Sequence, residues 1–287
     1  MKHPLLMGVL TFFCAFSQYT FAQELAPSPE KYTAHNKGKF FIYWGGNRES
    51  YTKSDITFKG DGYNFTVNDV KAHDKPKGYH LDYVNPGRMT IPQTNLRIGY
   101  FISDHYNVSI GVDHMKYVMT QGQTANVTGE INLPASEAGA IHNGTYNNTP
   151  TVMSEDFLKF EHTDGLNYVH AQINRVDDIS KLFRIWNTDK IQINLTEGIG
   201  GGLLYPKTNA TLLSKKRHDD FHISGYGVSA QVGLNVTFFK HFFIQGELKG
   251  GYIDMQDIKT TSSNADSASQ HFGFFQRIIT VGGIFRL

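Results

Sequence analysis

The sequence of 287 residues contains a single cysteine, Cys14, so it cannot form a disulfide within the chain. Long hydrophobic runs are scarce as well. After residue 22, polar side chains interrupt every apolar stretch within a few positions, so no segment is predicted to cross a membrane as a helix. Basic and acidic side chains nearly balance, at 27 and 26, which gives no reason to expect a nucleic-acid partner. These absences exclude a disulfide-stapled fold, a helical membrane protein and an electrostatically driven nucleic-acid binder.

The first residues, 1–22, predict a secretory signal peptide. Lys2 gives a basic start, an apolar run follows, and Ala22 precedes the expected cleavage site. Cys14 would be removed with this segment, so no disulfide is expected in the mature chain. Residues 23–38 are polar and carry prolines, which predicts a flexible periplasmic lead. Residues 39–287 are expected to form one domain, because no linker divides them.

Residues 224–252 alternate between apolar and polar side chains with one short interruption. One side of the extended chain is apolar over its whole length, as at Val232 and Leu248, whereas the other carries amides and charges, as at Gln231 and Glu247. A soluble sandwich would place its Val and Leu core on that second side. The apolar side is therefore predicted to contact lipid, which makes this stretch a transmembrane β-hairpin.

Similar alternation elsewhere predicts an all-β fold, with six further strands at 39–48, 93–102, 106–120, 165–175, 190–205 and 270–287. The connections are long at 49–92, 121–163, 206–220 and 258–269, and shorter at 103–105, 177–189 and 239–241. That difference is typical of a transmembrane antiparallel up-and-down β-barrel, here with eight strands, long extracellular loops and periplasmic turns. A ten-stranded barrel that uses 56–70 as an extra hairpin stays open.

The last strand gives an independent indication of a barrel. Thr280, Gly282, Phe285 and Leu287 occupy the positions of the terminal pattern of outer-membrane barrels, although an aromatic residue is usual where Leu287 stands. This pattern resembles the signal that barrel-assembly machinery uses for insertion. The chain as a whole resembles the small eight-stranded outer-membrane proteins of the A, X and W classes.

That resemblance implies an outer-membrane location in a Gram-negative bacterium, with outer-membrane lipid and lipopolysaccharide as partners and no cofactor. Asp266-Ser267-Ala268 also resembles the O-glycosylation site of Bacteroidota, which favours a member from that group.

Four charged side chains are predicted to point into the barrel: Arg97, Asp113, Glu247 and Lys249. An eight-stranded barrel has an interior just wide enough to be filled by side chains. Because unpaired buried charges are costly, we expect these four to neutralise one another as a plug. A conducting or gated path is the alternative.

His222 and Ser224 are the candidate catalytic residues. They resemble the His-x-Ser pair of the lipid A deacylases, and their spacing on a strand would place an imidazole beside a hydroxyl. However, Gly225 stands where that family has Asn, and the next carboxylate, Glu247, is predicted to point inward. We therefore expect no catalytic activity.

Pairs of His and Asp occur at 73–74, 80–82, 162–164 and 218–220. Imidazole and carboxylate are ordinary metal ligands, but these pairs are expected to be solvated loop charges, so no metal site is predicted.

The sequence thus predicts an integral outer-membrane barrel with a structural or surface-interaction role. Its long extracellular loops, 49–92 and 121–163, would carry any extracellular ligand. A narrow pore for small or apolar solutes is the second interpretation, and a lipid A-modifying enzyme is the third.

Overall fold

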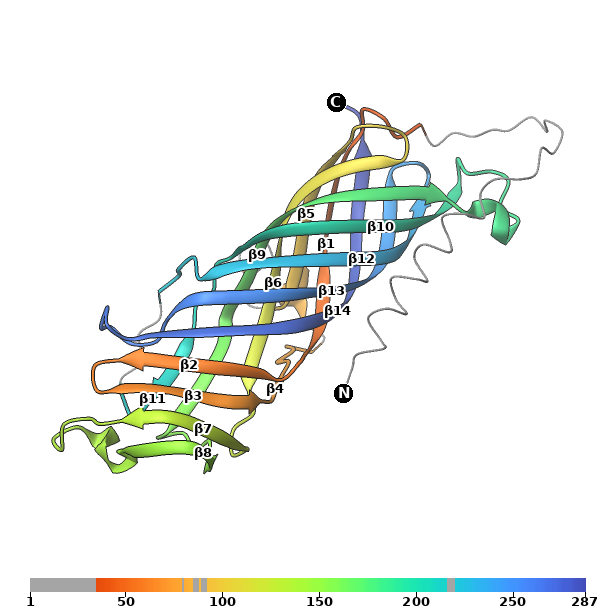
Figure 1. Cartoon of the computed structure of the whole chain (residues 1–287). Helices are drawn as coiled ribbons and strands as arrows, with labels where there is room; N and C mark the ends of the chain where they lie inside the picture. Colours follow the sequence, from red (N-terminus) through yellow and green to blue (C-terminus); the bar gives the residue numbers. More distant parts are fainter. Residues whose placement is uncertain (1–34, 79, 85–87, 89–91, 216–219) are drawn as a thin grey trace. The chain divides into compact units, whose positions relative to one another are not determined.

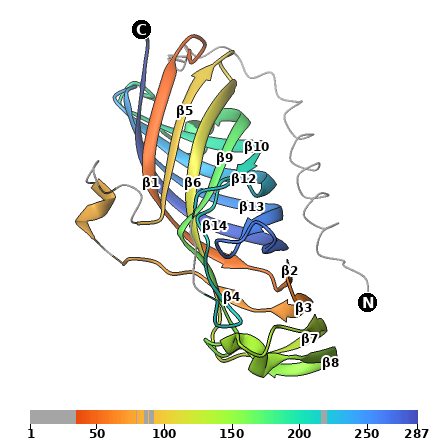
Figure 2. The same ribbon diagram turned by 90° about the vertical axis from the view of Figure 1, so that its left-hand side faces the viewer.

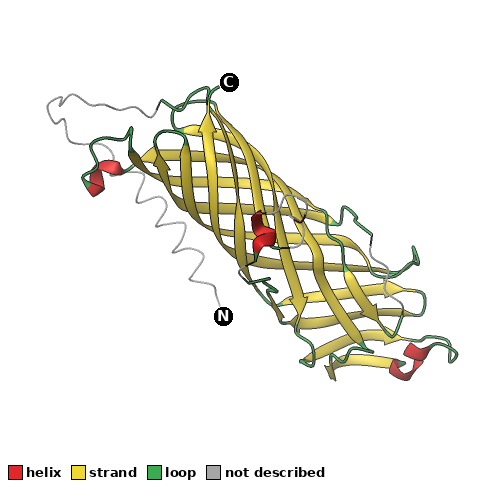
Figure 3. Cartoon of the chain, turned by 180° about the vertical axis from the view of Figure 1, so that it is seen from behind, coloured by secondary structure: helices red, strands yellow, loops and turns green. Residues whose placement is uncertain are grey.

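The computed structural model describes residues 35–78, 80–84, 88, 92–215 and 220–287. The predicted signal peptide at 1–22, most of the predicted lead at 23–38 and part of the His-Asp pair at 218–220 lie outside the described residues. Helix occurs as short 3₁₀ turns, at η1 (Leu81–Val84), η3 (Ala138–His142) and η4 (Ser180–Phe183), which Figure 3 shows in red. No described helix has the length and hydropathy needed to span a membrane.

Fourteen strands form one antiparallel sheet in the described part of the chain (Figure 1). The all-β antiparallel class is therefore confirmed, although the total exceeds the eight strands predicted. The strands are β1 (Phe40–Tyr51), β2 (Ser54–Gly60), β3 (Tyr63–Val70), β4 (Ala72–His73), β5 (Thr94–Phe101), β6 (Tyr106–Met119), β7 (Thr124–Ile131), β8 (Gly144–Val152), β9 (Leu158–Asp178), β10 (Ile191–Leu204), β11 (Asn209–Leu212), β12 (Gly225–Phe238), β13 (Phe242–Lys259) and β14 (Ser267–Phe285).

Eight strands pair in the order β1, β5, β6, β9, β10, β12, β13 and β14, and they occupy the ranges where strands were predicted. In addition, β14 pairs with β1, from Phe40 opposite Phe285 to Tyr51 opposite Phe274. Each of these eight strands therefore has a hydrogen-bonded neighbour on both sides. Their short connections lie at 102–105, 179–190 and 239–241.

The six other strands lie in segments predicted as long loops, and we call them the extension. β2 follows β1 directly and pairs with residues 267–270 of β14, beyond the part that β1 covers. β3 pairs with β2, β7 with β3, and β8 with β7, while β11 pairs with β9 and β4 with β6. The hairpin at 56–70 does exist, but it adds to the long-loop end of β14.

Along the eight long strands, the apolar side chains point away from the interior. Ile110 and Ile279 are 67% and 70% exposed, whereas their inward neighbours Ser109 and Thr280 are buried. This is the reverse of a soluble protein, in which apolar side chains fill the core. The reversal ends where the extension begins, since the inward residues of β14 change from Gln276 to Phe274 and Phe272.

Apolar side chains form two separate clusters inside. The larger cluster fills the extension, and its biggest fully buried members include Phe58, Phe65, Tyr117 and Phe160. The smaller cluster lies at the short-turn end and consists of Phe41, Tyr43, Phe101 and Phe243. The polar interior of the eight strands lies between these two apolar layers.

Glycine makes room for inward aromatic rings. Gly99 is the cross-strand partner of Phe41, and a Cβ at Gly99 would lie 2.1 Å from the Phe41 ring. Gly251 stands in the same relation to Phe274, with a Cβ distance of 2.5 Å. A larger residue at either position would displace the ring, so these glycines determine how the interior is filled.

Candidate functional site

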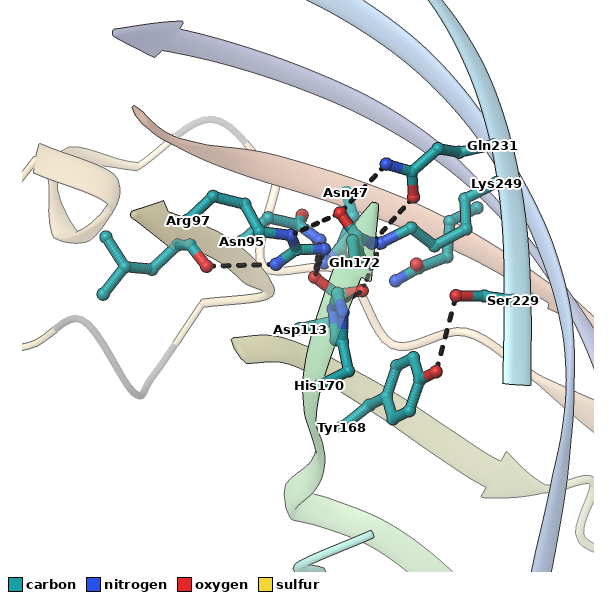
Figure 4. Close-up of polar contacts among 12 residues, drawn as sticks. Asn47, Asn95, Arg97, Asp113, Tyr168, His170, Gln172, Ser229, Gln231 and Lys249 are labelled. Atoms are coloured by element: carbon teal, nitrogen blue, oxygen red, sulfur yellow. Dashed lines mark hydrogen bonds and ion pairs between the residues drawn. The ribbon is translucent and has the colours of Figure 1, made fainter. Parts of the chain in front are cut away.

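Four side chains that meet inside the eight strands form what we call the Asp113 cluster: Arg97, Asp113, His170 and Lys249 (Figure 4). The Asp113 carboxylate oxygens lie 2.7 Å from Arg97 Nη2, 2.8 Å from Lys249 Nζ and 3.2 Å from His170 Nε2. The exposed fractions of Arg97, Asp113 and Lys249 are 1%, 0% and 0%. Charge-assisted hydrogen bonds are short and strong, so these contacts hold the four side chains together.

The ion pair between Asp113 and Lys249 crosses the interior. Asp113 lies on β6 and Lys249 on β13, which are four pairings apart in either direction around the eight strands. Lys249 also lies 3.8 Å from Glu247, so two cations and two carboxylates balance at this level. Attraction between the paired charges offsets part of the desolvation cost of burying them.

Amide side chains surround the cluster and form further hydrogen bonds with Arg97 and Asp113. Gln172 accepts from Arg97 Nε at 3.3 Å and exchanges hydrogen bonds with Gln231. Asn95 donates to Asp113 at 2.5 Å and accepts from Asn47 at 2.8 Å. The network is therefore connected across β1, β5, β9 and β12, as expected for polar groups that cannot reach water.

A pocket lies between the cluster and the short-turn end. Its empty space is about 750 Å³, including the part open to solvent. Amides such as Asn194 and Asn235 line it together with the rings of Phe41 and Phe243, and Lys39 and Lys240 also line it. Glu247 belongs to its lining, so the pocket reaches the level of the Asp113 cluster.

On the opposite side of the cluster, a second hydrogen-bonded group closes the interior. His162 bonds to Thr208 at 2.8 Å and to Gln270 at 3.4 Å, and Gln270 donates to the Tyr117 hydroxyl at 2.7 Å. Burial lowers the pKa of His162 to about 4, against a weaker opposing effect of the Gln270 hydrogen bond. The imidazole is therefore neutral at physiological pH.

Of the predicted lumen residues, the structure brings Arg97, Asp113 and Lys249 into direct contact and leaves Glu247 at the edge. The four predicted lumen charges did not include His170, and no inward role was predicted for Gln172. Their signal was inward parity on β9, where Tyr168, His170 and Gln172 alternate with Val169 and Ala171. The strand predicted at 165–175 contains these three residues, and in the structure it extends over Leu158–Asp178.

His222 and Ser224 do not form a nucleophile and base pair. Ser224 is 3% exposed, and its hydroxyl donates to the backbone oxygen of His222 at 3.4 Å. The His222 ring pairs instead with Asp257, with Nε2 and Oδ2 2.7 Å apart. A serine nucleophile needs its hydroxyl beside the base, and the hydrogen bonds of these described residues do not supply that contact.

No group of three or more possible metal ligands occurs among the described residues. His80 lies 3.2 Å from Asp82, which also pairs with Lys77 and Arg88, and His162 is committed to the hydrogen bonds given above. Thr280 is buried on the inward side near the end of β14, and Gly282 is the cross-strand partner of Tyr43 and Phe243. Leu287 lies beyond Phe285, the last residue of the strand.

Solved structures of outer-membrane proteins are among those to which this chain is similar. OprG from Pseudomonas aeruginosa is 11% identical over 88% of this chain and 98% of its own, with a TM-score of 0.39. The outer membrane protein AlkL is 11% identical over 93% and 98%, with a TM-score of 0.40, and Ail of Yersinia pestis is 11% identical over 87% and 99%, with a TM-score of 0.30. No family model and no curated protein matches the sequence. At this similarity, the neighbours identify no ligand or activity for this chain.

The location follows from the outward surface of the eight strands. Backbone polar groups in lipid must be paired internally, which strands achieve when each has a partner on both sides. The eight strands meet that requirement and present an apolar band outward. Spanning strands with an apolar exterior and a polar interior are the architecture of outer-membrane proteins, and the protein lies in the outer membrane of a Gram-negative bacterium.

Proposed function

We propose that the protein is a closed, eight-stranded transmembrane barrel whose interior is sealed and whose role is exercised at the cell surface by the extension. The pairing of β14 with β1 supports closure. The extension continues from the end that carries the long connections, which outer-membrane barrels direct outward. In this orientation the short turns and the pocket lined by Phe41 and Phe243 face the periplasm.

The proposal of a sealed interior rests on one observation: the ion pair between Asp113 and Lys249 spans the barrel without exposure to water. Ions cross a pore only through a hydrated path or through sites that replace their hydration. Above the pair, the apolar cluster that includes Phe58 and Phe160 offers neither. We therefore favour a structural or surface-interaction role over a narrow pore.

A planar-bilayer recording tests this role. Purified full-length protein is expected to give no steady unitary conductance, because the interior is blocked at both levels. Insertion is checked on the same sample by the difference in gel mobility between unheated and heated protein. Steady conductance steps from inserted wild-type protein would favour the pore instead.

The proposal includes no catalytic step and no cofactor. It assigns the terminal residues Thr280, Gly282 and Phe285 to recognition by the barrel-assembly machinery, and the extension to an extracellular ligand. The sheet formed by β2, β3, β7 and β8 gives such a ligand an ordered surface above the lipid. Binding residues on ordered elements are held more precisely than residues on irregular loops.

A further inference from the structure

Two arginines lie side by side on the outward surface of the eight long strands, which we call the wall. Arg48 on β1 and Arg277 on β14 are cross-strand partners, and Arg277 lies between the outward side chains of Phe275 and Ile279. Directly opposed like charges destabilise a sheet, and an arginine on the lipid face costs more the deeper it lies. Neither guanidinium forms an ion pair with a described residue: Arg48 donates instead to the Asn47 carbonyl at 2.6 Å and to the Tyr83 hydroxyl at 3.3 Å. In the part of the chain that the structure describes, no carboxylate neutralises the pair.

The depth of the pair suits a lipid headgroup. Arg277 precedes Phe285, the last residue of β14, by eight residues. A strand tilted by about 45° gains roughly 2.3 Å of depth per residue, which puts Arg277 about 18 Å above Phe285 in an apolar band about 25 Å tall. Arginine side chains extend toward the interface while their stems stay in lipid, so both guanidinium groups reach the boundary on the long-loop side.

A groove runs beside the pair on the same wall. Its lining combines the two arginines with His80, Tyr83, Leu248 and Ile279. Gly246 forms part of the groove, and a Cβ there would meet nothing within 4 Å, so the space above it is open. Charged donors at one end and apolar side chains along the wall match an amphiphile with an anionic head and hydrocarbon chains.

The turn η1 and the residues just before it form the other side of the groove. Trp44 Nε1 donates to the Tyr83 carbonyl at 2.6 Å, which holds the turn against the wall, beside β1 in Figure 2. Lys77 and Arg88 both pair with a single carboxylate, Asp82. Arg48, Arg277, Lys77 and Arg88 thus outnumber the two carboxylates near the groove, Asp82 and the lining residue Glu247, and the excess has the sign that an anionic headgroup requires.

We propose that Arg48 and Arg277 bind the phosphate group of an outer-leaflet lipid whose acyl chain lies in the groove along Leu248 and Ile279. Arginine suits this task because its planar fork binds phosphate through two parallel hydrogen bonds. The inference rests on the proposed membrane barrel, since the site exists only where this wall meets lipid. The bound phosphate offsets the repulsion between the two cations.

Native mass spectrometry of the full-length protein in detergent tests the proposal. The probes are lipid A with its phosphates, the same lipid without phosphates, and inorganic phosphate alone. Wild type is expected to retain phosphorylated lipid A at least about tenfold more tightly than the dephosphorylated form, and R48Q/R277Q is expected to lose that preference. The control R175Q removes another outward arginine, one that already pairs with Asp177, and is expected to bind like wild type.

A stability measurement keeps the test decisive if lipid retention is weak. Without lipid, R48Q/R277Q is expected to unfold at the same urea concentration as wild type or a higher one, because it removes a repulsion. Phosphorylated lipid A is expected to stabilise wild type and not the double variant. Equal retention of the two lipid A forms, equal binding by wild type and R48Q/R277Q, or retention of inorganic phosphate alone would overturn the proposal. A conducting barrel would overturn the sealed role and leave this site untouched, so the two failures are distinguishable.

Discussion

Asp113→Asn is expected to destabilise the folded protein by about 3–5 kcal/mol, because it leaves Arg97 and Lys249 buried without their shared carboxylate. Both cations contact Asp113 within 3 Å, and Lys249 retains only Glu247, at 3.8 Å. The measurement is urea unfolding in detergent micelles, followed by the mobility of unheated samples on gels. Lys249→Met added to Asp113→Asn is expected to recover part of the loss, since it removes one of the unpaired cations.

Asp177→Asn provides the matched control. Asp177 also pairs with an arginine, Arg175 at 2.6 Å, but the two side chains are 30% and 46% exposed. Pairs in contact with water contribute at most about 1 kcal/mol. If Asp113→Asn and Asp177→Asn shifted the urea midpoint by the same small amount, the buried bridge would not hold the barrel together.

Phe160→Ala is expected to destabilise the extension by about 3–5 kcal/mol, the usual cost of removing a large buried ring. Phe160 is almost fully buried, and its ring lies 5.6 Å from that of Phe58 and 4.9 Å from that of His162. The loss should be local, because the interior of the eight strands is held by polar contacts instead. Limited proteolysis in micelles should therefore cut β7 and β8 while the barrel keeps its folded mobility.

Phe183→Ala serves as the control for Phe160→Ala, since Phe183 lies in the turn η4 and its side chain is largely exposed. It is expected to leave the proteolysis pattern unchanged. Cleavage at the same rate in both variants would mean that the extension has no cooperative core of its own.

The long strands were predictable because their pattern has a single physical cause. Lipid on one side and packed polar groups on the other impose strict alternation, so 224–238 and 270–287 could be recognised from side-chain type alone. The ion pairs of Arg97, Asp113 and Lys249 followed from the same parity. The contacts between specific atoms did not, because parity gives the direction of a side chain and not its depth.

The extension could not be recognised for a related reason. In β2 and β3, the inward residues Ile56, Phe58, Phe65 and Val67 are apolar and pack against each other, as in a soluble protein. The apolar side chains therefore change from the outward to the inward side of the strands at the membrane boundary. A search for strands with lipid-facing apolar side chains assigns these segments to loops. The pairing of β2 with β14 is also remote in sequence, so no local signal indicates it.

Site-directed spin labelling tests the central claim, that hydrocarbon covers the outward faces of the eight strands. The sequence suits it, because Cys14, the only cysteine, lies in the predicted signal peptide, and each introduced cysteine would be unique. In lipid vesicles, nitroxides at Val232 and Leu248 should collide freely with dissolved oxygen, which concentrates in hydrocarbon, whereas a nitroxide at Gln231 should be shielded. Shielded labels at Val232 and Leu248, with Gln231 accessible, would place the apolar side inside the fold and contradict the account.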